Sequence, residues 1–188
     1  MDSRAKTERH AGAVGTNPVL RKWLTQAALD VQHAILGRLI HVVDLGAGSG
    51  HHLPLWDDCL RKFSPGTLVY GTDLPEVVDR HGALVQKDRL TWGTETGRDK
   101  TLVLSSNVVN VQENLRQFKE LCNTAHGLGK YWLINYPRTP RKLYAWDHRV
   151  LRGKLWDNGW VIQQHYPEKS CPVWLLRSLA GIAGVDNS

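Results

Sequence analysis

HVVDLGAGSG, residues 41–50, decides the fold of this chain of 188 residues. Its first half is an apolar run of strand length that contains Asp44, and Gly46, Gly48 and Gly50 follow at alternate positions. Glycine adopts positive φ angles at little cost and lets a ligand approach the main chain closely. The stretch therefore predicts a strand that ends in a ligand-binding turn, followed by a helix whose first N–H groups are free.

A second strand, expected over residues 68–73, ends in the carboxylate of Asp73. In open α/β sheets, ligands bind at the carboxyl ends of the strands, where the strand order reverses. Asp44 and Asp73 both fall at such ends, and a carboxylate can accept hydrogen bonds from two ribose hydroxyls. The acids and the glycines therefore predict a nucleotide-binding cleft, although both acids could instead cap loops at the strand ends.

Two interpretations of this cleft compete. A dinucleotide-binding turn has the pattern G-x-G-x-x-G with an acid about 20 residues further on, which would indicate an NAD(P)-dependent oxidoreductase. Here glycine stands at every second position, Asp73 lies further along, and Asp44 would repel a pyrophosphate. A cationic ligand gains from that charge, and S-adenosylmethionine carries a sulfonium and an ammonium group. The pattern favours the cationic ligand.

The rest of the chain alternates helices and strands. The pattern predicts a three-layer, Rossmann-like α/β sandwich with a mostly parallel seven-stranded sheet and an antiparallel strand in a C-terminal hairpin. Helices are expected over residues 17–37, 51–63, 75–80, 112–126 and 143–157, and strands over 41–45, 68–73, 83–86, 101–106, 131–135, 160–166 and 172–177. Residues 91–100 are expected to form a polar loop.

The chain is long enough for one domain with its own core. We expect a mobile arm over residues 1–16, a single domain over 17–180 and a tail over 181–188. The start of the chain is charged and no apolar segment follows it, so neither a secretory signal nor a membrane anchor is expected. The three cysteines are far apart and without metal-ligand spacing, which predicts thiols in the cytoplasm and no metal site: Cys59, Cys122 and Cys171.

The stretch from Asp44 to Gly50 resembles motif I of the class I S-adenosylmethionine-dependent methyltransferases. Asp73 resembles the acid with which that family binds the ribose, and the C-terminal hairpin is similar to its sixth and seventh strands. The resemblance covers residues 17–179 and implies S-adenosylmethionine as the cofactor. In it, Asp44 would hold the methionine ammonium group, and Leu74 would pack on the adenine. The cofactor-binding residues that it implies are Asp44, Gly46, Ala47, Gly48, Gly50, Asp73, Leu74, Asp88 and Ser106. Asp88 could also belong to a solvated run of charges.

Methyl transfer depends mostly on in-line positioning, so no catalytic triad is expected. Asn107, after the fourth strand, could orient an acceptor or cap the next helix. The Asn/Asp-Pro-Pro-aromatic signature of amino-methylating DNA enzymes is absent there, and so is a Pro-Cys nucleophile.

After the fifth strand, Tyr136 could stack on a base in a loop rich in cations, or the loop could be a proline-braced connection. The cations that would contact phosphates are Arg138, Arg141 and Lys142.

The net charge of +6 and the pI of about 9.4 fit a polyanionic partner such as DNA or RNA without requiring one. The sequence thus predicts methyl transfer from S-adenosylmethionine to an unidentified acceptor, with an anionic or nucleic-acid substrate favoured and no membrane partner. A non-catalytic, methyltransferase-like module that binds the cofactor or a nucleic acid is the alternative.

Overall fold

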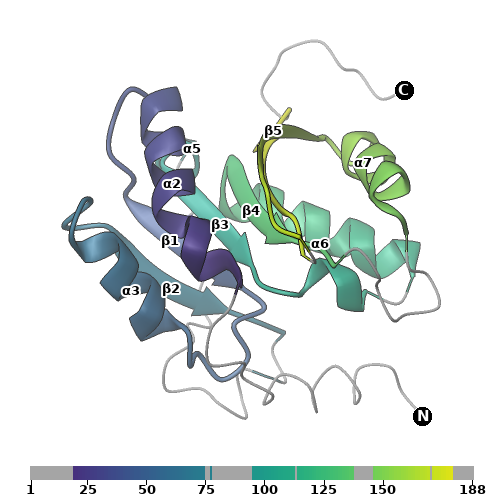
Figure 1. The fold of residues 1–188 in the computed structure, drawn as a ribbon, viewed down its shortest axis with the longest axis horizontal. Coiled ribbons are helices and arrows are strands. Elements are labelled where there is room, and N and C mark those ends of the chain that lie inside the picture. The colour runs from purple at the N-terminus through teal and green to yellow at the C-terminus, as the bar shows by residue number, and fades with distance from the viewer. Residues whose placement is uncertain are drawn as a thin grey trace.

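The computed structural model of the chain describes residues 19–74, 77, 95–112, 114–137, 146–169 and 171–179. These residues form a layered α/β structure (Figure 1). Its helices are α2 (Val19–Ala34), α3 (Leu53–Arg61), α5 (Glu95–Asp99), the 3-10 helix η2 (Val109–Val111), α6 (Leu115–Leu128) and α7 (His148–Asp157). Its strands are β1 (His41–Leu45), β2 (Leu68–Thr72), β3 (Thr101–Ser105), β4 (Tyr131–Asn135), β5 (Trp160–Tyr166) and β6 (Val173–Ser178).

The six strands form one sheet in the order β2-β1-β3-β4-β6-β5. The pairs among β2, β1, β3 and β4 are parallel, whereas β6 is antiparallel to both β4 and β5. The chain enters the sheet at β1, adds β2 on one side and then crosses to add β3 on the other. This reversal beside β1 places the carboxyl ends of β1, β2 and β3 next to one another, where an open α/β sheet binds its ligand.

Helices cover both faces of the sheet, α2 and α3 on one side and α6 and α7 on the other (Figure 1). Adjacent strand residues point to opposite faces, so Val42 packs with the α2/α3 side and Val43 with the α6/α7 side. All five residues of β3 and all five of β4 are buried, as expected for strands covered on both faces. Asp44 lies two residues after Val42, so its side chain also points to the α2/α3 side of the sheet.

The predicted α/β sandwich with its antiparallel C-terminal strand is confirmed. The structure shows six strands, and the expected seventh, residues 83–86, lies outside the described residues. The expected helix over 75–80 lies outside them except for Val77, and so do the expected arm, 1–16, and tail, 181–188.

The predicted starts of two helices and one predicted loop were wrong. Helix α6 begins at Leu115 instead of 112, because the Asn114 side chain accepts a hydrogen bond from the Gln117 N–H at 2.9 Å. Helix α7 begins at His148 instead of 143, because Asp147 is extended and caps the Val150 N–H at 2.8 Å. The expected loop over 91–100 contains the short helix α5, Glu95–Asp99, which leads directly into β3.

The three cysteine thiols are free in the structure. Cys122 lies on the buried face of α6, and burial raises the pKa of its thiol to about 12. Cys59 and Cys171 are half-buried. Within the described parts of the chain, no helix is long and apolar enough to cross a membrane.

Gly153, in the middle of α7, offers a simple test of this fold. A Cβ at this position would meet no heavy atom within 4 Å, and alanine is more stable than glycine in the interior of a helix. We expect Gly153→Ala to raise the free energy of unfolding by about 0.5–1 kcal/mol in urea denaturation. An unchanged or lower stability would mean that α7 is not a regular, exposed helix at this point.

Candidate cofactor site

The turn after β1 is built on glycines in the left-handed region. Gly46, Gly48 and Gly50 have φ angles of +89°, +59° and +76°, which other residues adopt only with strain. At Gly46 space is also short, because a Cβ would lie 2.4 Å from Cγ2 of Val108. The predicted requirement for glycine therefore has two causes, backbone conformation and the close approach of the loop after β3.

Hydrogen bonds tie this turn to the end of β2. The N–H groups of Gly46 and Ala47 both donate to the Thr72 carbonyl, at 2.8 and 3.2 Å. The Gly50 N–H donates to the Ala47 carbonyl at 2.9 Å and closes the turn. Ala47 also packs on the buried end of β2, since a Cβ on Gly71 would lie 2.9 Å from the Ala47 Cβ. The turn is thus a fixed element of the site.

Asp73 lies beside the glycine turn, as predicted. Its Oδ2 accepts the Gly48 N–H and its Oδ1 accepts the Leu74 N–H, each at 2.7 Å. The capping role that the sequence left open is therefore real. Because each carboxylate oxygen has two lone pairs, the same group can still accept hydrogen bonds from a ligand. The Leu74 side chain, next to Asp73, is 44% exposed.

Asp44 is buried on the α3 side of β1, with 2% of its surface exposed. Its Oδ2 accepts a hydrogen bond of 2.7 Å from the indole Nε1 of Trp56 on α3. Burial raises the pKa of Asp44 to about 6; the Trp56 hydrogen bond works in the opposite direction, and the negative charge of Asp73 adds to the rise. In the described part of the chain, no cationic side chain pairs with Asp44. The site thus holds a poorly compensated negative charge, which a bound cation would stabilise.

Asn107, directly beyond β3, is in the left-handed region with a φ of +60°. Its N–H donates to Oδ1 of Asn135 at 2.8 Å, and its own Oδ1 accepts from Nδ2 of Asn135 at 2.7 Å. Asn135, the last residue of β4, is fully buried and also donates to Sγ of Cys171 at 3.1 Å. Asn107 therefore caps no helix. It is held by the end of the neighbouring strand, in a left-handed conformation that asparagine adopts more readily than most residues.

The loop after β3 faces the glycine turn. Ser106 is half-buried at its start, and Val108 packs directly on Gly46. The Asn135 side chain fixes Asn107, and Asn107 in turn fixes its neighbour Val108. The predicted cofactor turn and the predicted acceptor loop are therefore brought together at the same edge of the sheet.

Tyr136 does not lie where base stacking would need it. It is 3% exposed and belongs to the core between the sheet and α7. Its N–H donates to the Pro172 carbonyl at 3.1 Å, its ring contacts His148 edge-on at 5.9 Å, and burial raises the pKa of its hydroxyl. This position favours the structural interpretation of Tyr136 as part of a braced connection.

The other predicted site residues, Asp88, Arg138, Arg141 and Lys142, lie outside the described residues. Their roles stay predictions. Among the residues that the structure does describe, no group of three or more His, Cys, Asp or Glu side chains could hold a metal ion.

Sequence reasoning missed three residues of the site. Trp56 has the spacing of a core residue in its helix, and nothing in the sequence shows that its indole N–H would meet Asp44. Asn135 could have been noticed, because a polar residue at the end of the apolar run 131–134 occupies the same kind of position as Asp44. Val108 gives no signal in the sequence, since only the folded chain brings it to Gly46.

Comparison with known proteins gives structural matches only. No protein-family model and no curated protein sequence matches the chain. Magnesium protoporphyrin IX methyltransferase ChlM from Synechocystis PCC 6803 with bound SAM has a TM-score of 0.54 at 15% identity, and the match covers 95% of this chain and 98% of that one. OxaC with SAH and oxaline has a TM-score of 0.65 at 12% identity, and LepI with SAM one of 0.59 at 15% identity. Each of these two matches covers 94% of this chain and 52% of the other.

The chain thus spans nearly the whole of ChlM and about half the length of OxaC and LepI. It has the fold of the class I S-adenosylmethionine-dependent methyltransferases, as the resemblance in the sequence implied.

Proposed function

We propose that this chain, which has the class I methyltransferase fold, binds S-adenosylmethionine and transfers its methyl group to an acceptor. The observation that carries the proposal is the buried Asp44 carboxylate. It lies at the end of β1, close to the negative charge of Asp73 and without a cationic partner among the described residues. The positively charged end of S-adenosylmethionine would supply that missing charge.

The residues around the glycine turn fit this cofactor. Asp44 lies on one side of the turn, where the ammonium group of the methionine part would be held. Asp73 follows the neighbouring strand, and its carboxylate, which accepts the Gly48 and Leu74 N–H groups, can also accept hydrogen bonds from the ribose hydroxyls. The exposed Leu74 side chain comes next and can pack on the adenine. A cation site, a ribose acceptor and an apolar surface thus follow one another across the carboxyl ends of β1 and β2.

S-adenosylmethionine supplies an activated methyl group on its sulfonium, so the chain's own residues need mainly to orient the two reactants. In the proposed mechanism the glycine turn and Asp73 fix the cofactor. Ser106 and Asn107, at the end of β3, would orient an acceptor toward the activated methyl group that the bound cofactor supplies. The Asn135 amide positions Asn107 for this role.

The acceptor in this proposal is anionic or a nucleic acid, and the argument for it is the charge of +6 together with Arg138, Arg141 and Lys142, which follow β4 in the sequence. We infer a cytoplasmic location from the reducing state expected for the three cysteines. A module that binds the cofactor without turnover is the second candidate, because neither Ser106 nor Asn107 is a general base.

Calorimetry with S-adenosylhomocysteine and NAD in parallel tests the cofactor. We expect binding of S-adenosylhomocysteine and none of NAD, because Asp44 would repel the NAD pyrophosphate. Binding of NAD alone would replace the proposal with an oxidoreductase. Incubation with methyl-labelled cofactor and bulk RNA, DNA or lysate protein then tests turnover, and binding without transfer of label to any of them would favour the module.

A further inference from the structure

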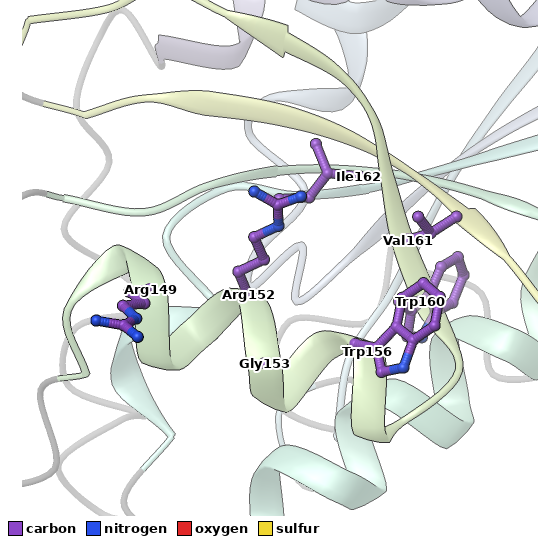
Figure 2. A pocket seen from close by; sticks show the side chains of 7 residues that line it. All are labelled: Arg149, Arg152, Gly153, Trp156, Trp160, Val161 and Ile162. Carbon is purple, nitrogen blue, oxygen red and sulfur yellow. The ribbon is translucent and has the colours of Figure 1, made fainter.

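A groove lies between α7 and the edge strand β5, and it encloses a cavity of about 410 Å³ (Figure 2). We call it the α7–β5 groove and define it by Arg149, Arg152, Trp156, Trp160, Val161 and Ile162. β5 is the last strand on one edge of the sheet, whereas β2 and β1 lie at the other edge. The groove is therefore separate from the candidate cofactor site.

The α7 wall of the groove carries two cations and an aromatic ring in a row. Arg149, Arg152 and Trp156 are three and four residues apart, a spacing that places them on one face of a helix, over a length of about 10 Å. In Figure 2 the Arg152 side chain extends from α7 toward Ile162 on β5, and Arg149 lies one turn away along the helix. The row runs along the groove and does not converge on one point.

These three side chains are available to a ligand. Neither Arg149 nor Arg152 forms an ion pair with any described residue, while the nearby Asp157 carboxylate lies 3.9 Å from Nζ of Lys154. Trp156 is 60% exposed, the most exposed tryptophan in the part of the chain that the structure describes. A large exposed aromatic side chain at the end of a row of two guanidinium groups is a common feature of binding surfaces.

The floor of the groove contains a polar group that lacks a partner. Trp160 is 1% exposed and its ring stacks on His126 at 4.2 Å. Its indole Nε1 is buried and has no hydrogen-bond partner among the described residues. This donor is covered by the protein, so the groups that can meet a ligand in the groove are the side chains of α7.

We propose that the α7–β5 groove binds single-stranded nucleic acid, with a base stacked on Trp156 and successive phosphates on Arg152 and Arg149. Stacking on an exposed indole beside a row of cations is the usual mode of recognition of single strands without sequence preference. An acidic peptide would use the two cations but would gain little from the flat face of Trp156. The proposal does not depend on methyl transfer, because no residue of the groove belongs to the cofactor site.

The test is fluorescence anisotropy of a labelled oligouridylate of about 12 nucleotides, titrated with the full chain at several salt concentrations. We expect Trp156→Ala to weaken binding about tenfold and Trp156→Phe to retain most of the affinity. Arg149→Gln with Arg152→Gln should reduce the slope of log K against log salt by about 1.4, because two phosphate contacts are lost. Arg21→Gln with Lys62→Gln is the matched control, since it removes two exposed charges on the α2/α3 side.

An unchanged affinity in Trp156→Ala, or an equal loss of salt dependence in the control and the groove variant, would overturn the proposal in favour of diffuse attraction by net charge. Polyglutamate serves as a competitor. If it displaces the oligonucleotide equally well from the wild-type chain, and its own binding depends on Trp156 to the same degree, the groove binds acidic peptides instead. Failure of the wild-type chain to bind the oligonucleotide would also overturn it.

Discussion

Asp44→Asn is expected to weaken binding of S-adenosylmethionine at least tenfold, or about 1.4 kcal/mol, at neutral pH. The substitution keeps an oxygen that can accept the Trp56 N–H, so the packing between β1 and α3 is retained while the negative charge is removed. Calorimetry measures the loss. Asp58→Asn is the matched control, because Asp58 is an exposed carboxylate on α3, outside the site, with its Oδ1 4.0 Å from Arg61. Equal affinities in the wild-type chain and Asp44→Asn would contradict the assignment.

The same substitution should change the pH dependence of stability. The pKa of Asp44 rises from 3.8 to about 6 on folding, so the folded chain binds the proton more tightly than the unfolded chain. This contribution to stability is fully present below pH 4 and is lost as the pH rises through 6, with a size of the order of 3 kcal/mol. Urea unfolding of the ligand-free chain should therefore show Asp44→Asn to be more stable than the wild type at pH 7. Asp58→Asn should not share this gain.

Gly46→Ala is expected to lower the free energy of unfolding by about 3 kcal/mol and to abolish cofactor binding. An alanine at a φ of +89° costs about 1–2 kcal/mol, and its Cβ would lie 2.4 Å from Cγ2 of Val108, which adds a further 1–3 kcal/mol of overpacking. Either the turn or the loop after β3 has to move, and both belong to the site. Chemical denaturation measures the first effect and calorimetry the second.

Two further variants separate the causes of that loss. Gly153→Ala makes the same chemical change at an open helix position and should not destabilise the chain. Val108→Ala removes the two methyl groups nearest the new Cβ, so the double variant Gly46→Ala, Val108→Ala should recover the overpacking part and keep the backbone part. A Gly46→Ala chain as stable as the wild type would show that Val108 does not pack on the turn.

Much of the fold was predictable because it rests on local signals. The apolar run at residues 41–45 and the alternate glycines predicted a strand followed by a turn, and the structure shows both, with positive φ angles at the glycines. Asp73 was placed beside that turn by its position at the end of β2 alone. The final hairpin followed from two apolar runs joined by a short polar segment, and β6 does run antiparallel to β4.

The features that the sequence did not reveal depend on contacts between distant residues. The pairing of Asn107 with Asn135 crosses 28 positions, and it excludes the helix cap, one of the two roles that the sequence left open for Asn107. The sequence around Tyr136 fits a base-stacking residue and a residue of a braced connection equally well. Only the packing of α7 against the sheet shows that Tyr136 is buried. The pKa of Asp44 is raised because α3 buries its carboxyl, and no local sequence pattern predicts that burial.

The release of protons on binding tests the central claim most directly. Near pH 6 about half of the Asp44 carboxyls in the ligand-free chain carry a proton, and a cation bound beside this group would expel it. Titration of S-adenosylmethionine at pH 6 in two buffers of different ionisation enthalpy counts the protons. We expect release of about half a proton per site in the wild-type chain and none from this source in Asp44→Asn. Release that is absent in the wild type, or identical in the two chains, would contradict the account.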